Sequence, residues 1–147
     1  MIRKACVADA ARLAEIEIFN YRLNFYPIFR NDEFYFGELN VPDMMRQYET
    51  SPELLAATWV YDDGVVKGFV RVCGSEIQKL FVEPALQGGG IGAALLEFAV
   101  LQHGAVWLWA LEKNTRAIAF YRRHGFRVTA ERKPEDDTTE YLVRMER

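Results

Sequence analysis

The segment between residues 77 and 111 constrains the fold more than any other part of the chain. An apolar run over 77–82 is followed by a proline and a glycine cluster, then by apolar positions at helical spacing over 91–99. A second apolar run covers 105–111. Strand, helix and strand in this order predict two parallel strands joined by a right-handed crossover. The glycine cluster therefore lies where a strand ends and a helix begins.

The other apolar runs predict a mixed α/β (α+β) fold, with a mostly antiparallel sheet of about seven strands and roughly four helices. Further strands are expected over 2–5, 55–61, 65–72, 126–131 and 139–145, and further helices after Asp9, near Pro42 and over 114–124. The Asp62-Asp63-Gly64 segment predicts a hairpin turn, because glycine tolerates positive φ. We expect Asp9 to cap the first helix. The apolar face expected for that helix consists of Leu13, Ile16, Phe19 and Leu23.

Composition limits the classes of protein to consider. The chain has 147 residues, of which 50% are hydrophobic, and we expect residues 1–147 to form a single domain. A net charge of -3 argues against a nucleic-acid partner, since such binders are normally basic. No long uncharged apolar run is present, so neither a membrane span nor a secretory signal is expected. A homodimer is compatible with the sequence, which does not indicate an oligomeric state.

Cysteine and histidine are too sparse to suggest a metal site or a disulfide. Cys6 and Cys73 form no C-x-x-C pair, and we expect both to be small buried residues in a reducing cytoplasm. His103 and His124 are isolated from any cluster of metal ligands, so no metal is expected.

The glycine cluster Gln87-Gly88-Gly89-Gly90-Ile91-Gly92 is suited to binding phosphate. Free amides and the positive end of a helix dipole meet there, and glycines let phosphate oxygens approach the backbone closely. A tight turn without a ligand is the simpler interpretation of the cluster alone. A Walker A loop is excluded because Ala93 stands where a lysine is required. A Rossmann loop with Glu112 as the ribose-binding acid is weakened by Leu95 at the third small position and by the short chain.

A third interpretation comes from resemblance to a known family. The cluster at 87–92 is similar to the Q/R-x-x-G-x-G/A pyrophosphate loop of the GNAT N-acetyltransferases, and the segment 80–84 resembles the strand end before it. Residues 114–126 resemble the family's N-x-x-A-x-x-x-Y-x-x-x-G-F segment. The resemblance covers about residues 55–130. It implies an N-acetyltransferase that uses acetyl-CoA as cosubstrate, without a metal.

The resemblance also implies roles for individual residues. The expected coenzyme contacts are Leu80, Phe81, Val82, Gln87, Gly88, Gly89, Gly90, Ile91, Gly92, Asn114, Ala117, Phe120 and Tyr121. A backbone amide near Val82 would stabilise the negative charge that develops on the thioester oxygen of acetyl-CoA. Asn114 would contact the pantetheine arm of the coenzyme and would also cap its own helix. Tyr121 would be the general acid, and Glu76, at the position of the catalytic glutamate of the histone-acetyltransferase branch, the base. The alternative for Tyr121 is an aromatic side chain that only packs against its neighbours. The alternative for Glu76 is an exposed carboxylate at the start of a strand.

The acceptor side is predicted from composition. Eight aromatic residues lie within 19–36, and six acids but only one base lie within 31–53. We hypothesise an aromatic-walled pocket with an acidic rim for a cationic amine, with Phe25, Tyr26 and Phe29 as acceptor contacts. The simpler interpretation is that these aromatic residues form the edge of the hydrophobic core and that the acids lie on solvated helix faces.

The resemblance leaves the acceptor and the activity open. The glutamate of the ribosomal-protein N-terminal acetyltransferase branch falls on Trp109 here, which weakens a protein N-terminus as acceptor. A small amine and a peptide amine both remain, as does a catalytically silent acyl-CoA sensor or interaction module. The presence of both Tyr121 and Glu76 argues against the silent module.

Overall fold

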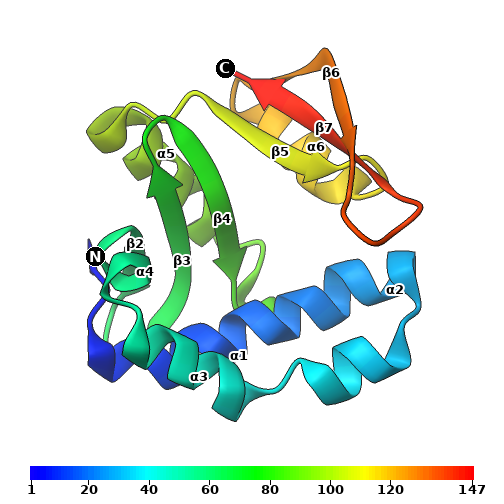
Figure 1. The fold of residues 1–147 in the computed structure, drawn as a ribbon. Helices are drawn as coiled ribbons and strands as arrows, with labels where there is room; N and C mark the ends of the chain where they lie inside the picture. The colour runs from blue at the N-terminus through cyan, green and yellow to red at the C-terminus, as the bar shows by residue number, and fades with distance from the viewer.

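The computed structural model describes residues 1–147 as seven strands in one sheet, with helices on both faces (Figure 1). The strands are β1 (Ile2–Lys4), β2 (Thr58–Asp62), β3 (Val66–Cys73), β4 (Glu76–Val82), β5 (Trp107–Leu111), β6 (Arg127–Pro134) and β7 (Tyr141–Glu146). Their order across the sheet is β1-β2-β3-β4-β5-β7-β6. Only β4 and β5 pair in parallel. The predicted mixed sheet and its parallel strand–helix–strand unit are therefore confirmed.

Six α-helices are present where about four were expected. They are α1 (Ala10–Asn20), α2 (Tyr26–Phe29), α3 (Val41–Thr50), α4 (Pro52–Ala56), α5 (Ile91–His103) and α6 (Thr115–Arg123). The aromatic segment after α1 is helical as well, with π-helices at Tyr21–Phe25 and Phe34–Glu38 on either side of α2. Pro27 is tolerated because it lies in the first turn of α2, where a missing N–H costs nothing. The strand predicted over 55–61 is wrong at its start, because Pro52 begins α4 and Leu55 packs from that helix into the core.

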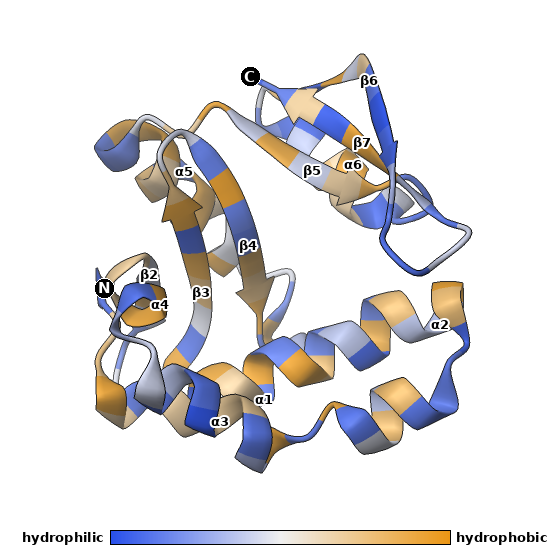
Figure 2. Ribbon diagram, viewed as in Figure 1, coloured by the Kyte–Doolittle hydropathy of each residue, from blue (hydrophilic) through white to orange (hydrophobic).

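Two apolar cores lie on opposite faces of the sheet. One packs α5 and α6 against β3, β4, β5 and β7, with Leu95, Leu108 and Met145 at its centre. The other packs α1 and α3 against β2 and β3, around Leu13 and Phe69. Edge strand β6 is mostly hydrophilic and exposed (Figure 2), as suits an edge that must not pair with another chain.

Strands β4 and β5 separate after a short stretch of pairing. Their parallel register comprises only Glu76 with Trp107 and Ile77 with Leu108. Beyond these residues the two strands diverge, and Figure 1 shows the two halves of the sheet opening like a V toward α1 and α2. The edge of β4 over 78–82 is consequently left without a strand partner on the side of β5.

Helix α1 buries half of the predicted apolar face. Leu13 and Ile16 are fully buried as predicted, whereas Phe19 is 37% exposed and Leu23, which lies beyond the end of α1, is 46% exposed. Glu17 and Asn20 are buried as well, and both form hydrogen bonds in the interior. Their burial could not be inferred from a rule that places polar residues outside.

Three local expectations near the chain's turns are also corrected. The Asp9 side chain does not cap α1, since it accepts hydrogen bonds from the Cys6 amide at 2.9 Å and from Arg3. Cys6 and Cys73 are exposed rather than buried, because one precedes a helix and the other ends β3. Both remain free thiols.

Candidate active site

A cavity of about 340 Å³ lies between the end of β4, the glycine cluster and α6. We call it the glycine-loop cavity. Every coenzyme contact predicted from sequence lines it except Gly89. Arg116, Arg123 and His124 of the α6 segment line it as well, so positive charge lies beside the glycines. The structure thus brings these segments, far apart in the chain, to the wall of one cavity, and their contact with a coenzyme stays a prediction.

The glycine loop is shaped by two residues with left-handed backbone. Gly88 has φ 87° and Gly90 has φ 88°, a region that other residues rarely adopt. Gly90 is the N-cap of α5 and offers no side chain to the first-turn amides. Those amides and the positive end of the α5 dipole are therefore available to an anion.

The end of β4 presents its backbone to the gap between the strands. The Glu83 amide donates to the Lys67 carbonyl at 2.8 Å, on the β3 side. Because successive residues of a strand face opposite neighbours, the amide and carbonyl of Val82 face the other way. The Val82 carbonyl accepts hydrogen bonds from Asn20 and Gln87, while its amide has no strand partner on that side.

A second and larger cavity, of about 930 Å³, adjoins the first. We call it the aromatic cavity. Its aromatic wall consists of Tyr21, Phe25, Phe29, Phe34, Tyr35, Phe81, Trp109 and Tyr121. Phe25 and Phe29 line this cavity, and their contact with an acceptor stays a prediction. Tyr26 does not line the cavity, because its hydroxyl donates to Asp32 on the exposed surface.

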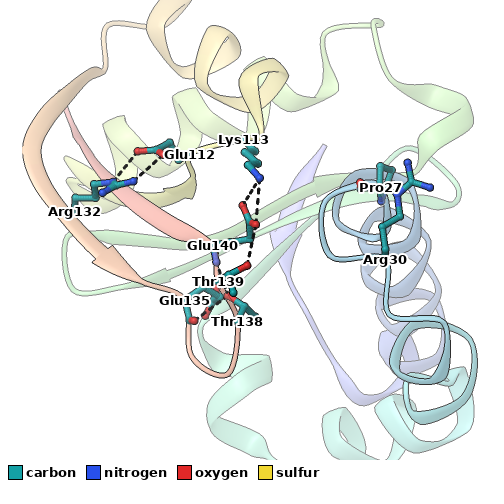
Figure 3. A network of polar contacts seen from close by, with 9 residues as sticks. All are labelled: Pro27, Arg30, Glu112, Lys113, Arg132, Glu135, Thr138, Thr139 and Glu140. Carbon is teal, nitrogen blue, oxygen red and sulfur yellow. Dashed lines mark hydrogen bonds and ion pairs between the residues drawn. The ribbon is translucent and has the colours of Figure 1, made fainter.

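The acids around the aromatic cavity come mostly from an unexpected place. Of the six acids between residues 31 and 53, only Glu38 contributes to the lining. Four more acids line the cavity, all from the segment between β6 and β7: Glu135, Asp136, Asp137 and Glu140. Figure 3 shows this hairpin, where the Lys113 Nζ lies 3.1 Å from a Glu140 carboxylate oxygen. Acids therefore do line the cavity, but most of them come from another segment than the hypothesis expected, and the cationic amine stays a prediction.

Tyr121 lies where the two cavities meet. Tyr121, together with Leu80, Phe81, Asn114 and Ala117, lines both of them. Its side chain is nearly buried, and burial alone raises the pKa of its phenol. The phenol consequently stays protonated at neutral pH and can donate a proton. Asn114 caps α6 by accepting from the Ala117 amide at 3.3 Å, so its capping role is confirmed, while its contact with the pantetheine arm stays a prediction.

Glu76 begins β4 and lies outside the walls of both cavities. In the strand register its neighbours are Cys73 and Trp107. The first residue of β4 in the aromatic cavity is Ile77. The role of Glu76 as a base therefore stays a prediction.

A buried charge network beside the aromatic cavity was missed. Glu17 accepts hydrogen bonds from Tyr21 at 2.6 Å and from Tyr48, and its carboxylate lies 3.2 Å from the Lys79 Nζ. Arg71 lies 3.8 Å away on the other side. Burial alone would raise the pKa of Glu17, but Lys79 and the two tyrosine hydroxyls outweigh it and lower the pKa. Tyr21 and Lys79 expose this network to the cavity.

Comparison with known proteins identifies the fold. The sequence model described as the acetyltransferase (GNAT) domain matches residues 55–128, half of the chain, including the glycine loop and α6. The chain belongs to the GNAT family. The predicted resemblance is thereby confirmed.

This GNAT chain is similar to named proteins and to solved structures. It is 33% identical over 85 residues to the peptidyl-lysine N-acetyltransferase YjaB of Salmonella typhimurium strain LT2, an alignment that covers 58% of this chain and only 59% of that protein. The solution structure of apo YjaB from Escherichia coli matches with a TM-score of 0.78 at 23% identity, over 99% of this chain and 95% of that one. The Paia N-acetyltransferase from Thermoplasma acidophilum, solved with coenzyme A, matches with a TM-score of 0.70 at 18% identity, over 100% and 98%. These two structures share the fold.

Two further observations concern metals and membranes. His, Cys, Asp and Glu side chains nowhere gather in a group of three or more that could hold a metal ion. None of the helices has the length and apolar character that crossing a membrane requires.

Proposed function

We propose that this GNAT protein is an acetyl-CoA-dependent N-acetyltransferase that acetylates a primary amine by direct attack. The observation that carries the proposal is the meeting of two cavities at Tyr121 and the open edge of β4. The glycine-loop cavity offers amides and arginines to a pyrophosphate, and the aromatic cavity offers apolar walls and acids to an amine. The fold shared with an acetyltransferase solved with coenzyme A supports it.

In this mechanism the two cavities hold the two substrates. Glycine-loop amides would bind the pyrophosphate of acetyl-CoA, and the Val82 amide would donate to the thioester oxygen as negative charge develops on it. A neutral acceptor amine would form the new bond to the acetyl carbon, and Tyr121 would give its proton to the departing sulfur. We keep Glu76 as the proposed base, acting through water because it lies outside the cavity wall.

The acceptor we propose is a cationic amine, with a peptide lysine as the first candidate. Five acids line the aromatic cavity, Glu38, Glu135, Asp136, Asp137 and Glu140, whereas Lys79 is the one cation of its lining and Lys113, outside the lining, pairs with Glu140. Such an excess of negative charge attracts a protonated amine from solution. A relative named as a peptidyl-lysine N-acetyltransferase supports the lysine side chain over a small amine. A single domain over 1–147 and a cytoplasmic location, which the two free thiols favour, belong to the same proposal.

Acetyl-CoA is expected to raise the melting temperature of the protein. At about 100 times its dissociation constant a ligand adds about 2.7 kcal/mol to the unfolding free energy. For a domain of this size that corresponds to a rise of about 5 to 10 °C. Differential scanning fluorimetry with acetyl-CoA, and with NAD and ATP as controls, measures it. A shift with NAD instead of acetyl-CoA would contradict the proposed coenzyme.

A further inference from the structure

Asn20, the last residue of α1, is a polar side chain that the mechanism does not use. It is only 1% exposed. Its Nδ2 donates to the Ile16 carbonyl at 2.8 Å and to the Val82 carbonyl at 2.9 Å. Its Oδ1 accepts from the Gln87 side chain at 3.1 Å and from Asn24 at 3.3 Å. The side chain thus connects α1 to the end of β4 and to the glycine loop.

Three of these groups form a closed triangle beside the glycine-loop cavity. The Gln87 Nε2, which donates to Asn20, also donates to the Val82 carbonyl at 3.2 Å. Asn20, Val82 and Gln87 all line that cavity. Gln87 is the first residue of the glycine cluster, so the triangle joins the start of the loop to the strand that carries the Val82 amide.

A buried amide at this position needs an explanation. Burying an amide side chain costs free energy unless every donor and acceptor is paired, whereas an apolar residue could fill the contact between a helix and a strand without that requirement. Unlike an apolar side chain, the Asn20 amide forms directional hydrogen bonds. These hydrogen bonds fix the orientation of the Gln87 side chain and of the peptide group that follows Val82. Both groups lie at the entrance to the loop whose amides face the cavity.

We propose that Asn20 is a positioning residue for coenzyme binding, acting through Gln87 and the Val82 carbonyl. This inference rests on the proposed function, since it assigns coenzyme A to the glycine-loop cavity. A loop held in its binding conformation before the ligand arrives loses less entropy on binding. Without Asn20, the loop and the end of β4 would have to be ordered by the coenzyme itself.

The test is a double-mutant cycle on the affinity for coenzyme A, measured by isothermal titration calorimetry. Asn20→Leu and Gln87→Leu are each expected to weaken binding about tenfold. The double variant is expected to bind about as weakly as either single variant, because both changes remove the same triangle. Asn40→Ala is the control. Asn40 caps α3 by accepting a hydrogen bond from the Asp43 amide at 2.9 Å, and it does not line the glycine-loop cavity. The variant should therefore lower stability without changing that cavity. Its affinity for coenzyme A should equal that of the wild type.

The outcomes separate this inference from the proposed function. A wild-type protein that does not bind coenzyme A refutes the proposed function itself. Wild-type binding together with unchanged affinity in folded Asn20→Leu, or fully additive losses in the double variant, overturns the role of Asn20. If Asn20→Leu does not fold, Asn20→Ala, whose smaller side chain introduces no clash, takes its place: unchanged affinity in the folded variant overturns the inference, and a tenfold loss that is not additive with that of Gln87→Leu supports it.

Discussion

Replacing Tyr121 with phenylalanine is expected to lower kcat for acetyl transfer by about 100-fold or more, because a positioned general acid contributes at least that factor. The dissociation constant of acetyl-CoA should change less than about twofold, because the ring still fills the junction of the two cavities. Steady-state kinetics and calorimetry measure the two quantities separately. Because burial raises the pKa of Tyr121, the wild-type kcat should show no decrease near neutral pH from deprotonation of its phenol.

A matched control distinguishes proton donation from packing. Tyr35 is also a buried tyrosine of the aromatic cavity, but it does not line the glycine-loop cavity. Tyr35→Phe should keep kcat within about twofold of the wild type. An unchanged kcat in Tyr121→Phe would remove Tyr121 from the acid role. A loss of coenzyme affinity equal to the loss of kcat would indicate packing instead.

Replacing Glu17 with glutamine is expected to lower the unfolding free energy by about 3 to 5 kcal/mol, the usual cost of removing one partner from a buried ion pair. Every neighbour of the Glu17 carboxylate is a donor or a cation, so an amide nitrogen there would face Tyr21 or Tyr48. Arg71, buried beside it, would lose its counter-ion. Urea unfolding followed by circular dichroism measures the difference.

The same variant has a defined pH dependence. The pKa of Glu17 is lowered from its ordinary value of 4.5 in the folded protein, so its stabilisation is present above that pH and is lost on acidification. The difference in unfolding free energy between the wild type and Glu17→Gln should be constant from about pH 6 to 8 and should decrease below about pH 4.5. Glu15→Gln, on the exposed side of α1, is the control and should cost less than about 1 kcal/mol. A gap that does not narrow in acid would mean that Glu17 is not ionised in the folded protein.

Most of the residues that line the glycine-loop cavity were predictable because they lie in two contiguous segments, 80–93 and 114–124. The glycine loop and α6 each carry a local pattern, and the strand–helix–strand order places them at the same end of β4. Only Gly89, whose neighbours line the cavity, falls outside the wall. Local sequence is sufficient where one turn and one helix build the binding surface.

The wall of the aromatic cavity was less predictable because tertiary contacts assemble it. It comes from the segment 21–38, from β4, β5 and α6, and from the segment between β6 and β7, and no local pattern shows that Glu135 or Asp136 shares this wall with Phe25. Glu17 and Asn20 appear in the sequence as polar interruptions of an apolar helix face. Their partners, such as Tyr48, Arg71 and Gln87, are distant in sequence, and only the fold brings them together.

The most direct test of the proposed activity is acetyl transfer itself. We would measure release of the coenzyme A thiol from acetyl-CoA in the presence of a lysine-containing basic peptide and a panel of small primary amines, and confirm the product by mass spectrometry. The proposal predicts thiol release that depends on an amine, with a product heavier by one acetyl group. Saturable binding of acetyl-CoA without amine-dependent release across the panel would contradict it and would favour a catalytically silent acyl-CoA sensor.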